Sequence, residues 1–389
     1  MLPIDTGGKI RSYNILRQLI RSHEVTFLSD YSGEPDPSYE ADIARELPGA
    51  QTIRTDSPEA GTLGQYLSYV RGIFRAAPFA VSKFADRAVR SQVTAWLNER
   101  RFDVAVCDFL VATINFPRTL ATPTVLFQHN VESSLWKRRA STESKPVRRL
   151  AYKLEAAKME RYERREVRRF HSIIAVSDHD RRQMLEMGAS EITVVPTGVD
   201  TQKYQVSSPA NANPPRIVFT GSMDWEPNID AVNYFCCEIF PHVRRELPDS
   251  IFQIVGRQPP AIVKRLACDN VEVTGTVPSV SDYLRDATVV VVPLRAGAGT
   301  RLKIFEAMAI GKAVVSTSIG AEGLDVHNGS DIILADEPAA FANAIVRLTR
   351  DSGLRRQYEL AAARLASQYD WSNIAGVFAD ALQRACRKV

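Results

Sequence analysis

The chain has 389 residues, more than twice the ~150 typical of one domain, and this length predicts two domains. Hydrophobic residues make up 45% and charged residues 24%, a globular composition that excludes a disordered, collagen-like or coiled-coil chain. Because no run of ~18 apolar residues occurs and the opening MLPIDTGGKIR has no apolar core, we expect neither a transmembrane helix nor a signal peptide. Five scattered cysteines without metal-ligand spacing predict free thiols in a reducing cytoplasm.

Positive charge is concentrated in one part of the chain. The net charge is +4, but residues 137–169 hold 13 Lys and Arg against 5 Glu, and the remainder is net acidic. Apolar residues recur there at helical spacing, namely Val147, Leu150, Ala151, Leu154 and Ala157. We therefore expect a helix that packs through one face and turns a basic face either to solvent or to an anionic membrane surface. Nucleic acid is not expected as a partner, because the rest of the chain is acidic and has no aromatic platform.

Short β-branched runs alternate with helical stretches in both halves of the chain. Runs such as ATVVVVP at 287–293 are almost continuously apolar, which predicts strands buried on both faces of parallel sheets. The expected fold class is therefore α/β, with two doubly wound, Rossmann-like domains. The expected strands are 23–29, 51–55, 104–108, 123–129, 172–177 and 192–198 in the first half, and 216–221, 252–256, 271–275, 287–293, 313–317 and 331–335 in the second.

The polar, proline-rich stretch SSPANANPP at 207–215 separates the two series of strands and predicts a linker. The expected domains are residues 1–206 and residues 216–370. The amphipathic segment 371–389 is expected to form a helix that packs back on the first domain, although its pattern fits a terminal helix of the second domain nearly as well.

The strongest candidate for a ligand site is the segment PLRAGAGTRLKIFEAMAIGKAVVSTSIGAEG at 293–323. A buried strand leads into a loop with Gly297 and Gly299, and a helix is expected from about Thr300. Free backbone amides and the helix dipole at such a start favour an anion, above all a phosphate.

Charged side chains in this helix fit a nucleotide. Arg301 and Lys303 in the first turn oppose the helix dipole, which a bound anion would explain. Glu306, about two turns in, can accept hydrogen bonds from the vicinal hydroxyls of a ribose, so that the layout resembles a nucleotide site. An ordinary connection between strand and helix, with solvated charges, fits the composition about equally well.

A second glycine loop lies near the start of the chain. In TGGKIR, Gly7 and Gly8 precede a helix and can let the backbone approach a diphosphate, although a plain turn explains the pair as well. Such a loop normally follows a central strand, but only five residues precede Thr6. We therefore expect that the natural protein begins upstream of Met1, or that the first domain is atypical.

Two further positions carry polar groups after strands. His129 ends the run PTVLFQH, at the carboxyl end of a strand, where open α/β sheets bind ligands. Asp178 and Asp180 form a D-x-D string that can hold a divalent metal with a nucleotide. A helix cap formed by Ser177 or Asp178 is favoured over that reading, and no metal site is expected.

With these segments placed, the chain resembles retaining glycosyltransferases of the GT-B fold, family 4, over nearly its whole length. The resemblance rests on TGGKIRSYNILRQL, PTGVD at 196–200 and FTGSMDWEPNIDAVNYF at 219–235, and most specifically on GAGTRLKIFEAMAIGKAVVSTSIGAEGL at 297–324. It is similar to the subgroup found in bacterial exopolysaccharide and cell-envelope glycan clusters. The resemblance implies that the second domain binds a nucleotide-sugar donor, and that the first binds the acceptor across an interdomain cleft.

The resemblance carries roles to individual residues. Glu306 matches the ribose-binding glutamate, and His129 lies where many members place a histidine near the donor sugar. The expected catalytic residues are His129, Arg301, Lys303 and Glu306. The expected donor-binding residues are Gly7, Gly8, Gly221, Ser222, Gly256, Arg257, Thr276, Val277, Gly297, Ala298, Gly299, Thr300 and Glu306.

The chain also departs from the family pattern. The family has a pair of glutamates, of which the second matches Glu306 and the first falls at Ala298. The family's usual G-R…K loop reads Gly221-Ser222…Pro227 in this chain, without either cation. We expect Arg301 and Lys303 to replace those cations as neutralisers of the leaving diphosphate.

The resemblance implies a metal-independent glycosyltransferase that acts with retention in polysaccharide or cell-envelope glycan synthesis. The expected co-substrate is a UDP- or GDP-sugar, with no other cofactor, and the expected acceptor is a glycan or a lipid-linked molecule. The expected location is the cytoplasm or the inner face of the cell membrane. A nucleotide-sugar-binding protein without transferase activity, an epimerase of the same fold and a metal-dependent transferase using Asp178 and Asp180 remain alternatives.

Overall fold

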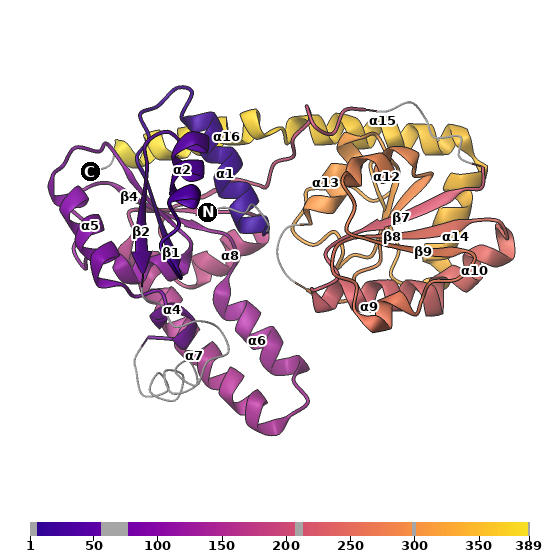
Figure 1. Ribbon diagram of the computed structural model, residues 1–389, viewed down its shortest axis with the longest axis horizontal. Coiled ribbons are helices and arrows are strands. Elements are labelled where there is room, and N and C mark those ends of the chain that lie inside the picture. Colours follow the sequence, from indigo (N-terminus) through magenta and orange to yellow (C-terminus); the bar gives the residue numbers. More distant parts are fainter. Residues whose placement is uncertain (1–5, 56–76, 207–212, 298–300, 388–389) are drawn as a thin grey trace. The chain divides into compact units, whose positions relative to one another are not determined.

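The computed structural model describes residues 6–55, 77–206, 213–297 and 301–387. The chain divides into two compact units, one made of residues 1–196 and 374–389 and the other of residues 197–373. Figure 1 shows parallel strands and surrounding helices in each unit. No helix in the described ranges is both long enough and apolar enough to cross a membrane.

The first unit contains two parallel sheets among its described residues. One pairs β1 (Phe27–Ser32) with β2 (Ala50–Thr55), and the other has the order β3-β4-β5-β6. The strands of the second sheet are β3 (Ala105–Asp108), β4 (Thr124–Gln128), β5 (Ser172–Ala175) and β6 (Ile192–Val194). Every residue of β4 is buried, as the apolar run VLF at its centre predicts for a central strand.

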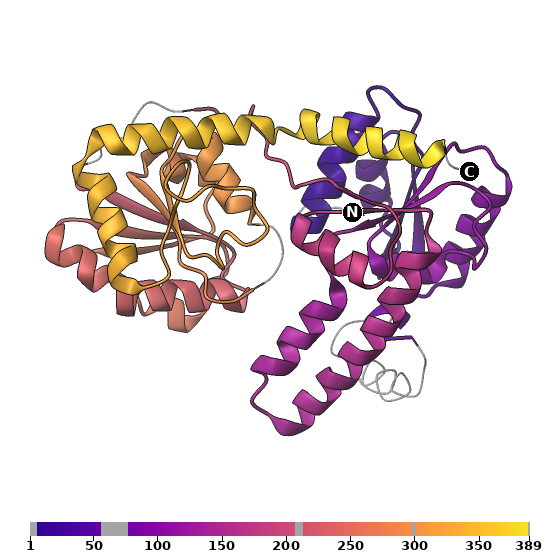
Figure 2. The same cartoon turned by 180° about the vertical axis from the view of Figure 1, so that it is seen from behind.

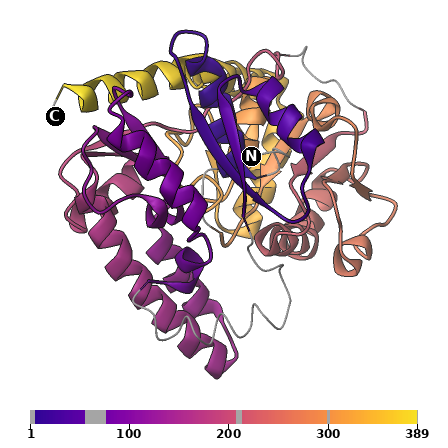
Figure 3. The ribbon, with the colours of Figure 1, turned by 60° about the vertical axis from the view of Figure 1, so that its left-hand side comes forward.

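Helices cover these strands. They are α1 (Gly7–Leu19), α2 (Pro37–Glu46), α4 (Phe79–Ser82), α5 (Arg87–Asn98), the 3₁₀ helix η1 (Leu110–Asn115), α6 (Glu132–Thr142), α7 (Pro146–Arg169), α8 (Asp178–Glu186) and α16 (Trp371–Cys386). The end of α16 lies along the first unit (Figure 3), where Phe378 packs edge-on against Phe127 and Arg384 donates to Thr193 Oγ1 at 3.3 Å.

The second unit is built on one six-stranded parallel sheet with the order β12-β11-β10-β7-β8-β9. Its strands are β7 (Arg216–Thr220), β8 (Ile251–Val255), β9 (Val271–Gly275), β10 (Val289–Val292), β11 (Val314–Ser316) and β12 (Ile333–Leu334). The helical elements are α9 (Glu226–Tyr234), the π-helical turn η2 (Phe235–Ile239), α10 (Phe240–Glu246), α11 (Ala261–Lys264), α12 (Val280–Asp286), α13 (Leu302–Ala309), α14 (Pro338–Arg350) and α15 (Ser352–Gln368). The order reverses between β7 and β10, and ligands bind at such switch points, outside the carboxyl ends of the strands.

Residues 197–206 belong to the second unit, although they precede the expected linker. The backbone N–H of Val199 donates to the carbonyl of Tyr369 at 2.8 Å, and Thr201 Oγ1 donates to Asp370 at 2.5 Å. Tyr204 is part of the hydrophobic core of this unit. These contacts pack residues 199–204 against the second unit.

The basic segment forms a helical hairpin of α6 and α7 (Figure 2), which differs from the expected packing. Val147, Leu150 and Leu154 are 80%, 60% and 51% exposed, so the expectation that this apolar face packs is wrong. The buried side chains of α7 come instead from its second half, namely Glu155, Ala156, Met159, Tyr162, Glu163, Glu166 and Val167. Spacing alone could not identify the packed face, because this helix carries two apolar stripes on different sides.

Candidate functional site

His129 lies directly after β4 and is only 3% exposed. Its ring stacks on Phe109, with centroids 4.0 Å apart, and also contacts the ring of Phe127. The last residue of β4 is Gln128, so the imidazole stands at the carboxyl end of a central strand, as expected from the sequence.

Two hydrogen bonds hold the imidazole. Arg11 Nη1 lies 2.6 Å from His129 Nδ1, and His129 Nε2 lies 2.6 Å from Asp108 Oδ1. A guanidinium can only donate, so Nδ1 accepts and the ring proton is on Nε2, which donates to Asp108. Ser12 Oγ donates to the other oxygen of that carboxylate at 2.5 Å.

The environment keeps His129 neutral. Burial is the main cause that lowers the pKa of His129, and the charge of Arg11 acts in the same direction, whereas Asp108 opposes both. Burial also lowers the pKa of Arg11 to about 10. The sequence did not single out Arg11, Ser12 or Asp108, although the position of Asp108 at the end of β3 was a usable signal.

Gly8 is required at its position by close packing. A Cβ atom there would lie 2.7 Å from two ring carbons of Phe109 and 3.8 Å from Nδ1 of His129. A Cβ on Gly7 would meet nothing within 4 Å. The structure therefore brings Gly8 and His129 together, and it places Gly7 as the first residue of α1.

In the second unit, two glycines lie back to back after neighbouring strands. Gly221 follows β7 and Gly256 follows β8, and a Cβ on Gly256 would lie 1.7 Å from the carbonyl oxygen of Gly221. A Cβ on Gly221 would be 2.7 Å from both Lys303 Nζ and Asn228 Nδ2. Gly256 thus lets the two loops approach each other, and Gly221 leaves room for side chains of α9 and α13 at the carboxyl edge of the sheet.

Ser222 and Arg257 extend the same edge. Arg257 Nε donates to Ser222 Oγ at 2.8 Å, and Ser222 Oγ donates to Asp224 at 2.5 Å. Thr276 and Val277 come directly after β9, the strand next to β8, and thus at the same end of the sheet.

Two cations lie at the start of α13. Lys303 Nζ donates to Asn228 Oδ1 at 2.8 Å and lies 4.2 Å from the centre of the Phe219 ring. Arg301 is 4% exposed, with its guanidinium 5.6 Å from the Trp225 ring centre. Burial and the charge of Arg301 lower the pKa of Lys303 to about 7, against the opposing effect of Glu306.

The expected helix is present. It begins at Leu302, with Arg301 as its N-cap, within two residues of the expected start. Ala298, Gly299 and Thr300 lie outside the described residues. Gly297 has φ +115° and would place a Cβ 2.8 Å from the Trp225 ring, so this position needs glycine.

Glu306 lies one helical turn beyond Lys303 and is engaged through one oxygen. Tyr204 Oη donates to Glu306 Oε1 at 2.9 Å. Burial raises the pKa of Glu306, while the Tyr204 hydroxyl and the charges of Lys203 and Lys303 lower it. The sequence did not identify Tyr204, because a residue 102 positions away carries no local signal of this contact.

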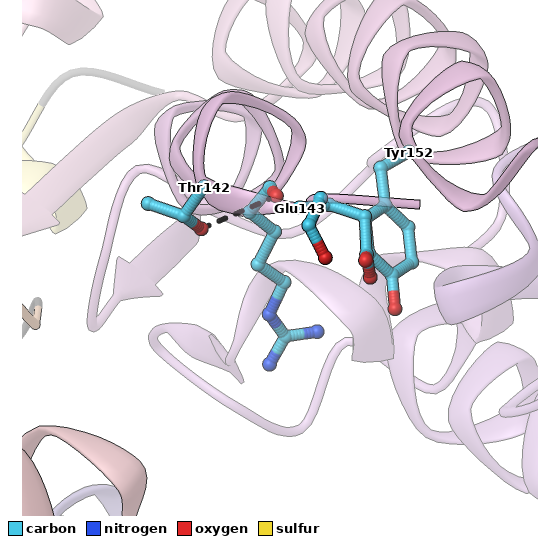
Figure 4. Close-up of a pocket in the computed structure, with 5 residues that line it drawn as sticks. Thr142, Glu143 and Tyr152 are labelled. Atoms are coloured by element: carbon cyan, nitrogen blue, oxygen red, sulfur yellow. Dashed lines mark hydrogen bonds between the residues drawn. The ribbon is translucent and has the colours of Figure 1, made fainter. Parts of the chain in front are cut away.

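The remaining candidates have other roles. Ser177 Oγ accepts from the N–H of Asp180 at 3.1 Å, which confirms the favoured helix cap, and Asp178 pairs with Arg181 at 2.9 Å. No cluster of three potential metal ligands occurs within the described ranges. A polar pocket opens at the turn of the α6–α7 hairpin (Figure 4), lined by Arg139, Thr142, Glu143, Ser144 and Tyr152, and it contains none of the expected site residues.

Comparison with known families and relatives agrees with this geometry. Residues 6–203 match the model of "Glycosyltransferase Family 4", and residues 214–351 match that of "Glycosyl transferases group 1". A phosphatidyl-myo-inositol mannosyltransferase of Mycobacterium leprae is 31% identical over 213 residues, which are 52% of this chain and 56% of that protein. The aligned region thus spans about half of the mannosyltransferase. An uncharacterized 44.6 kDa protein from the cps region of Klebsiella pneumoniae is 22% identical over 95% of this chain and 94% of its own length.

Solved structures share the fold over almost the whole chain. Sucrose-phosphate synthase of Thermosynechococcus elongatus superposes with a TM-score of 0.71 at 15% identity, covering 99% of this chain and 94% of the other. HepE of Anabaena in complex with UDP-glucose gives a TM-score of 0.60 at 16% identity, covering 98% and 96%. The expected α/β architecture of GT-B type is therefore confirmed. The match of one family model to half of the chain shows that the protein belongs to glycosyltransferase family 4.

Proposed function

We propose that this protein transfers a sugar from a UDP- or GDP-sugar to a glycan or lipid-linked acceptor, with retention and without a metal. This transfer is a step in the synthesis of a polysaccharide or of a glycan of the cell envelope. Membership of family 4 supports glycosyl transfer, and the HepE complex with UDP-glucose supports a nucleotide-sugar donor. The single observation that carries the proposal is a pair of cations beside the glycine edge of the second unit, the buried Arg301 and the half-buried Lys303.

These cations suit a leaving diphosphate. As the bond from the sugar C1 to the diphosphate breaks, negative charge grows on the leaving oxygen, and positioned donors stabilise it by several kcal/mol, by analogy with ~2.7–4 for one oxyanion-hole donor. Lys303, held by Asn228 next to Gly221, supplies such a donor. Glu306 keeps one oxygen, Oε2, for a ribose hydroxyl, while Tyr204 holds the other.

The state of His129 supports a front-face mechanism. Its Nδ1 accepts from Arg11 and its Nε2–H donates to Asp108, so the ring has no free lone pair with which to act as a base. In the proposed step, the acceptor oxygen bonds to C1 on the face that the diphosphate leaves, and the acceptor proton passes to a phosphate oxygen. The anomeric configuration is thereby retained.

The test is transfer by the full chain from UDP- and GDP-sugars to lipid-linked and soluble glycan acceptors. Retention is read from the anomeric coupling in the NMR spectrum of the product, and an inverted product would contradict the mechanism. Activity is expected to survive EDTA, and its loss would favour a metal bound at Asp178 and Asp180. A different sugar isomer released without acceptor would identify an epimerase, and nucleotide-sugar binding without any product would identify a binding protein.

We also propose that the protein works at the inner, anionic surface of the cell membrane. The exposed apolar stripe Val147, Leu150 and Leu154 lies on the side of α7 away from the packed residues Glu155 and Met159. Exposed cations stand beside this stripe, among them Lys145, Arg148, Arg149 and Lys153. Apolar side chains can enter the boundary of headgroups and acyl chains, and each cation adds ~1 kcal/mol near an anionic surface.

A further inference from the structure

Glu163 is a fully buried carboxylate in the second half of α7, with 0% of its surface exposed. It accepts hydrogen bonds from four donors. The backbone N–H of Glu132 lies 2.8 Å from Oε1, and the backbone N–H and the hydroxyl of Ser133 lie 3.0 and 2.5 Å from Oε2. The side-chain amide of Gln128 makes a short contact with Oε1.

These donors lie on both sides of His129. Gln128 is the residue before it, and Glu132 and Ser133 begin α6 after the connecting turn. One carboxylate therefore ties the end of β4 to the start of α6, and caps two free amides of that helix. The turn that presents His129 is fastened at both ends by the same side chain.

A second observation concerns the amide of Gln128. Its Oε1 atom is buried and has no hydrogen-bond partner among the described residues. The pKa of Glu163 is raised to about 7, mainly by burial and also by the charge of Glu132, against the opposing effect of the hydrogen bonds from Ser133 and Glu132. Glu132, on α6, is the charged group of a neighbouring element that acts on this carboxyl.

We propose that Glu163 is a positioning residue for His129 and that its protonation releases the turn between β4 and α6. When ionised, the carboxylate satisfies all four donors. A proton taken from solvent onto Glu163 places an O–H among donors, and the acceptor then within reach is Gln128 Oε1, after the amide turns over. The hydrogen bond from Gln128 Nε2 is then replaced by one to Gln128 Oε1, and Nε2 moves to the buried position where Oε1 has no partner among the described residues. A buried donor without an acceptor costs free energy, which destabilises the turn beside His129.

The inference rests on the proposed function only for its effect on turnover. The test therefore follows His129 itself, by ring ¹⁵N and ¹³C NMR signals of the full chain between pH 5.5 and 8.5. The chain has six histidines, and His129→Gln assigns the signal. The test variant is Glu163→Gln. The matched control is Glu155→Gln, a buried glutamate of the same helix, 3% exposed, which accepts from the N–H of Phe79.

In the wild type, the His129 signals are expected to shift with a midpoint near pH 7 while keeping the pattern of a neutral ring. Glu163→Gln should abolish this transition, and Glu155→Gln should retain it. With an active donor and acceptor pair, kcat/KM should fall about tenfold for Glu163→Gln relative to the control, because small displacements at a reacting centre are costly. The wild type should also lose kcat/KM as the pH falls below about 7, and this loss should be absent in Glu163→Gln.

Two results would overturn the inference. One is a wild-type His129 signal without the transition near pH 7, and the other is a transition that persists in Glu163→Gln. A transition that depends on Glu163 in a protein without transferase activity would support the positioning role and refute the proposed function. The two proposals can thus fail separately.

Discussion

Arg11 donates a hydrogen bond of 2.6 Å to Nδ1 of His129 and so joins α1 to the end of β4. This contact fixes the neutral imidazole tautomer, and Asp108 completes it from β3. His129, which the sequence suggests by its place after a strand and by the family resemblance, is therefore a fixed donor to a carboxylate. Its chemistry is set by residues 118 and 21 positions away.

Arg11→Ala is predicted to raise the pKa of His129 toward its usual 6.5, because the variant removes a neighbouring positive charge. In the wild type, folding favours the neutral form of His129. This group therefore adds to the stability of the folded protein above about pH 6.5, and the contribution is lost as the pH falls and the buried ring must be protonated. NMR titration of His129 measures the shift, with Arg17→Ala on the exposed side of α1 as control. An unchanged or lower pKa in Arg11→Ala would contradict the electrostatic account.

Lys303→Met is predicted to weaken binding of a nucleoside diphosphate by at least tenfold, because a charged hydrogen bond contributes ~1.5–3 kcal/mol. Lys312→Met is the control, since Lys312 is another lysine of this unit whose ammonium group is hydrogen-bonded, in this case to the Arg285 carbonyl at 2.6 Å. Titration calorimetry of both variants with UDP and GDP measures the effect. Equal losses of affinity would place the effect in the fold and not in the site.

Binding is also predicted to take up a proton above pH 7. Free Lys303 loses its proton near that pH, and a bound diphosphate would restore the charge by raising the pKa again. Affinity should accordingly fall as the pH rises from 7 to 9. Calorimetry in two buffers of different ionisation enthalpy measures the proton uptake at pH 8. Its persistence in Lys303→Met would assign the uptake to another group.

Tyr204→Phe is predicted to lower nucleotide affinity several-fold, since the Glu306 carboxylate loses the donor that fixes Oε1. The variant should also reduce the discrimination between the ribose nucleotide and its 2′- and 3′-deoxy analogues. Tyr234→Phe is the control, because its hydroxyl donates to a backbone carbonyl, that of Asp336, at 3.3 Å. Unaltered discrimination in Tyr204→Phe would argue against a ribose at Glu306.

Leu150→Glu is predicted to reduce binding to phosphatidylglycerol vesicles about tenfold, because a leucine side chain contributes ~1.5–3 kcal/mol when it leaves water. Leu360→Glu changes a comparably exposed leucine of α15 and should bind as the wild type does. Flotation at low and high salt separates the charge contribution, which salt screens, from the apolar one. Equal binding of the two variants, or a dimer in light scattering that Leu150→Glu dissolves, would contradict membrane docking.

Regular patterns made the fold predictable. Each of the twelve expected strands overlaps one strand of the structure, because buried parallel strands such as β10 are continuous runs of valine. The capping serine Ser177 was also recognisable, since its hydrogen bond is local in sequence.

Other features depend on tertiary contacts and could not be read from spacing. The hydrogen bonds of Arg11, Tyr204 and Glu163 each join distant segments, and the packed face of α7 is decided by what covers it. The lowered pKa of Lys303 arises mainly from burial, which depends on the tertiary fold, and only then from the charge of Arg301, which lies nearby in sequence.

The central claim is that the second unit binds the nucleoside diphosphate of a sugar donor. Thermal unfolding of the full chain with UDP, GDP, ADP and their sugar conjugates tests it most directly. A ligand at 100 times its dissociation constant adds ~2.7 kcal/mol to the stability of the state that binds it. The account predicts a rise in Tm with UDP or GDP that Lys303→Met diminishes and Lys312→Met preserves. An unchanged Tm with every nucleotide would contradict it.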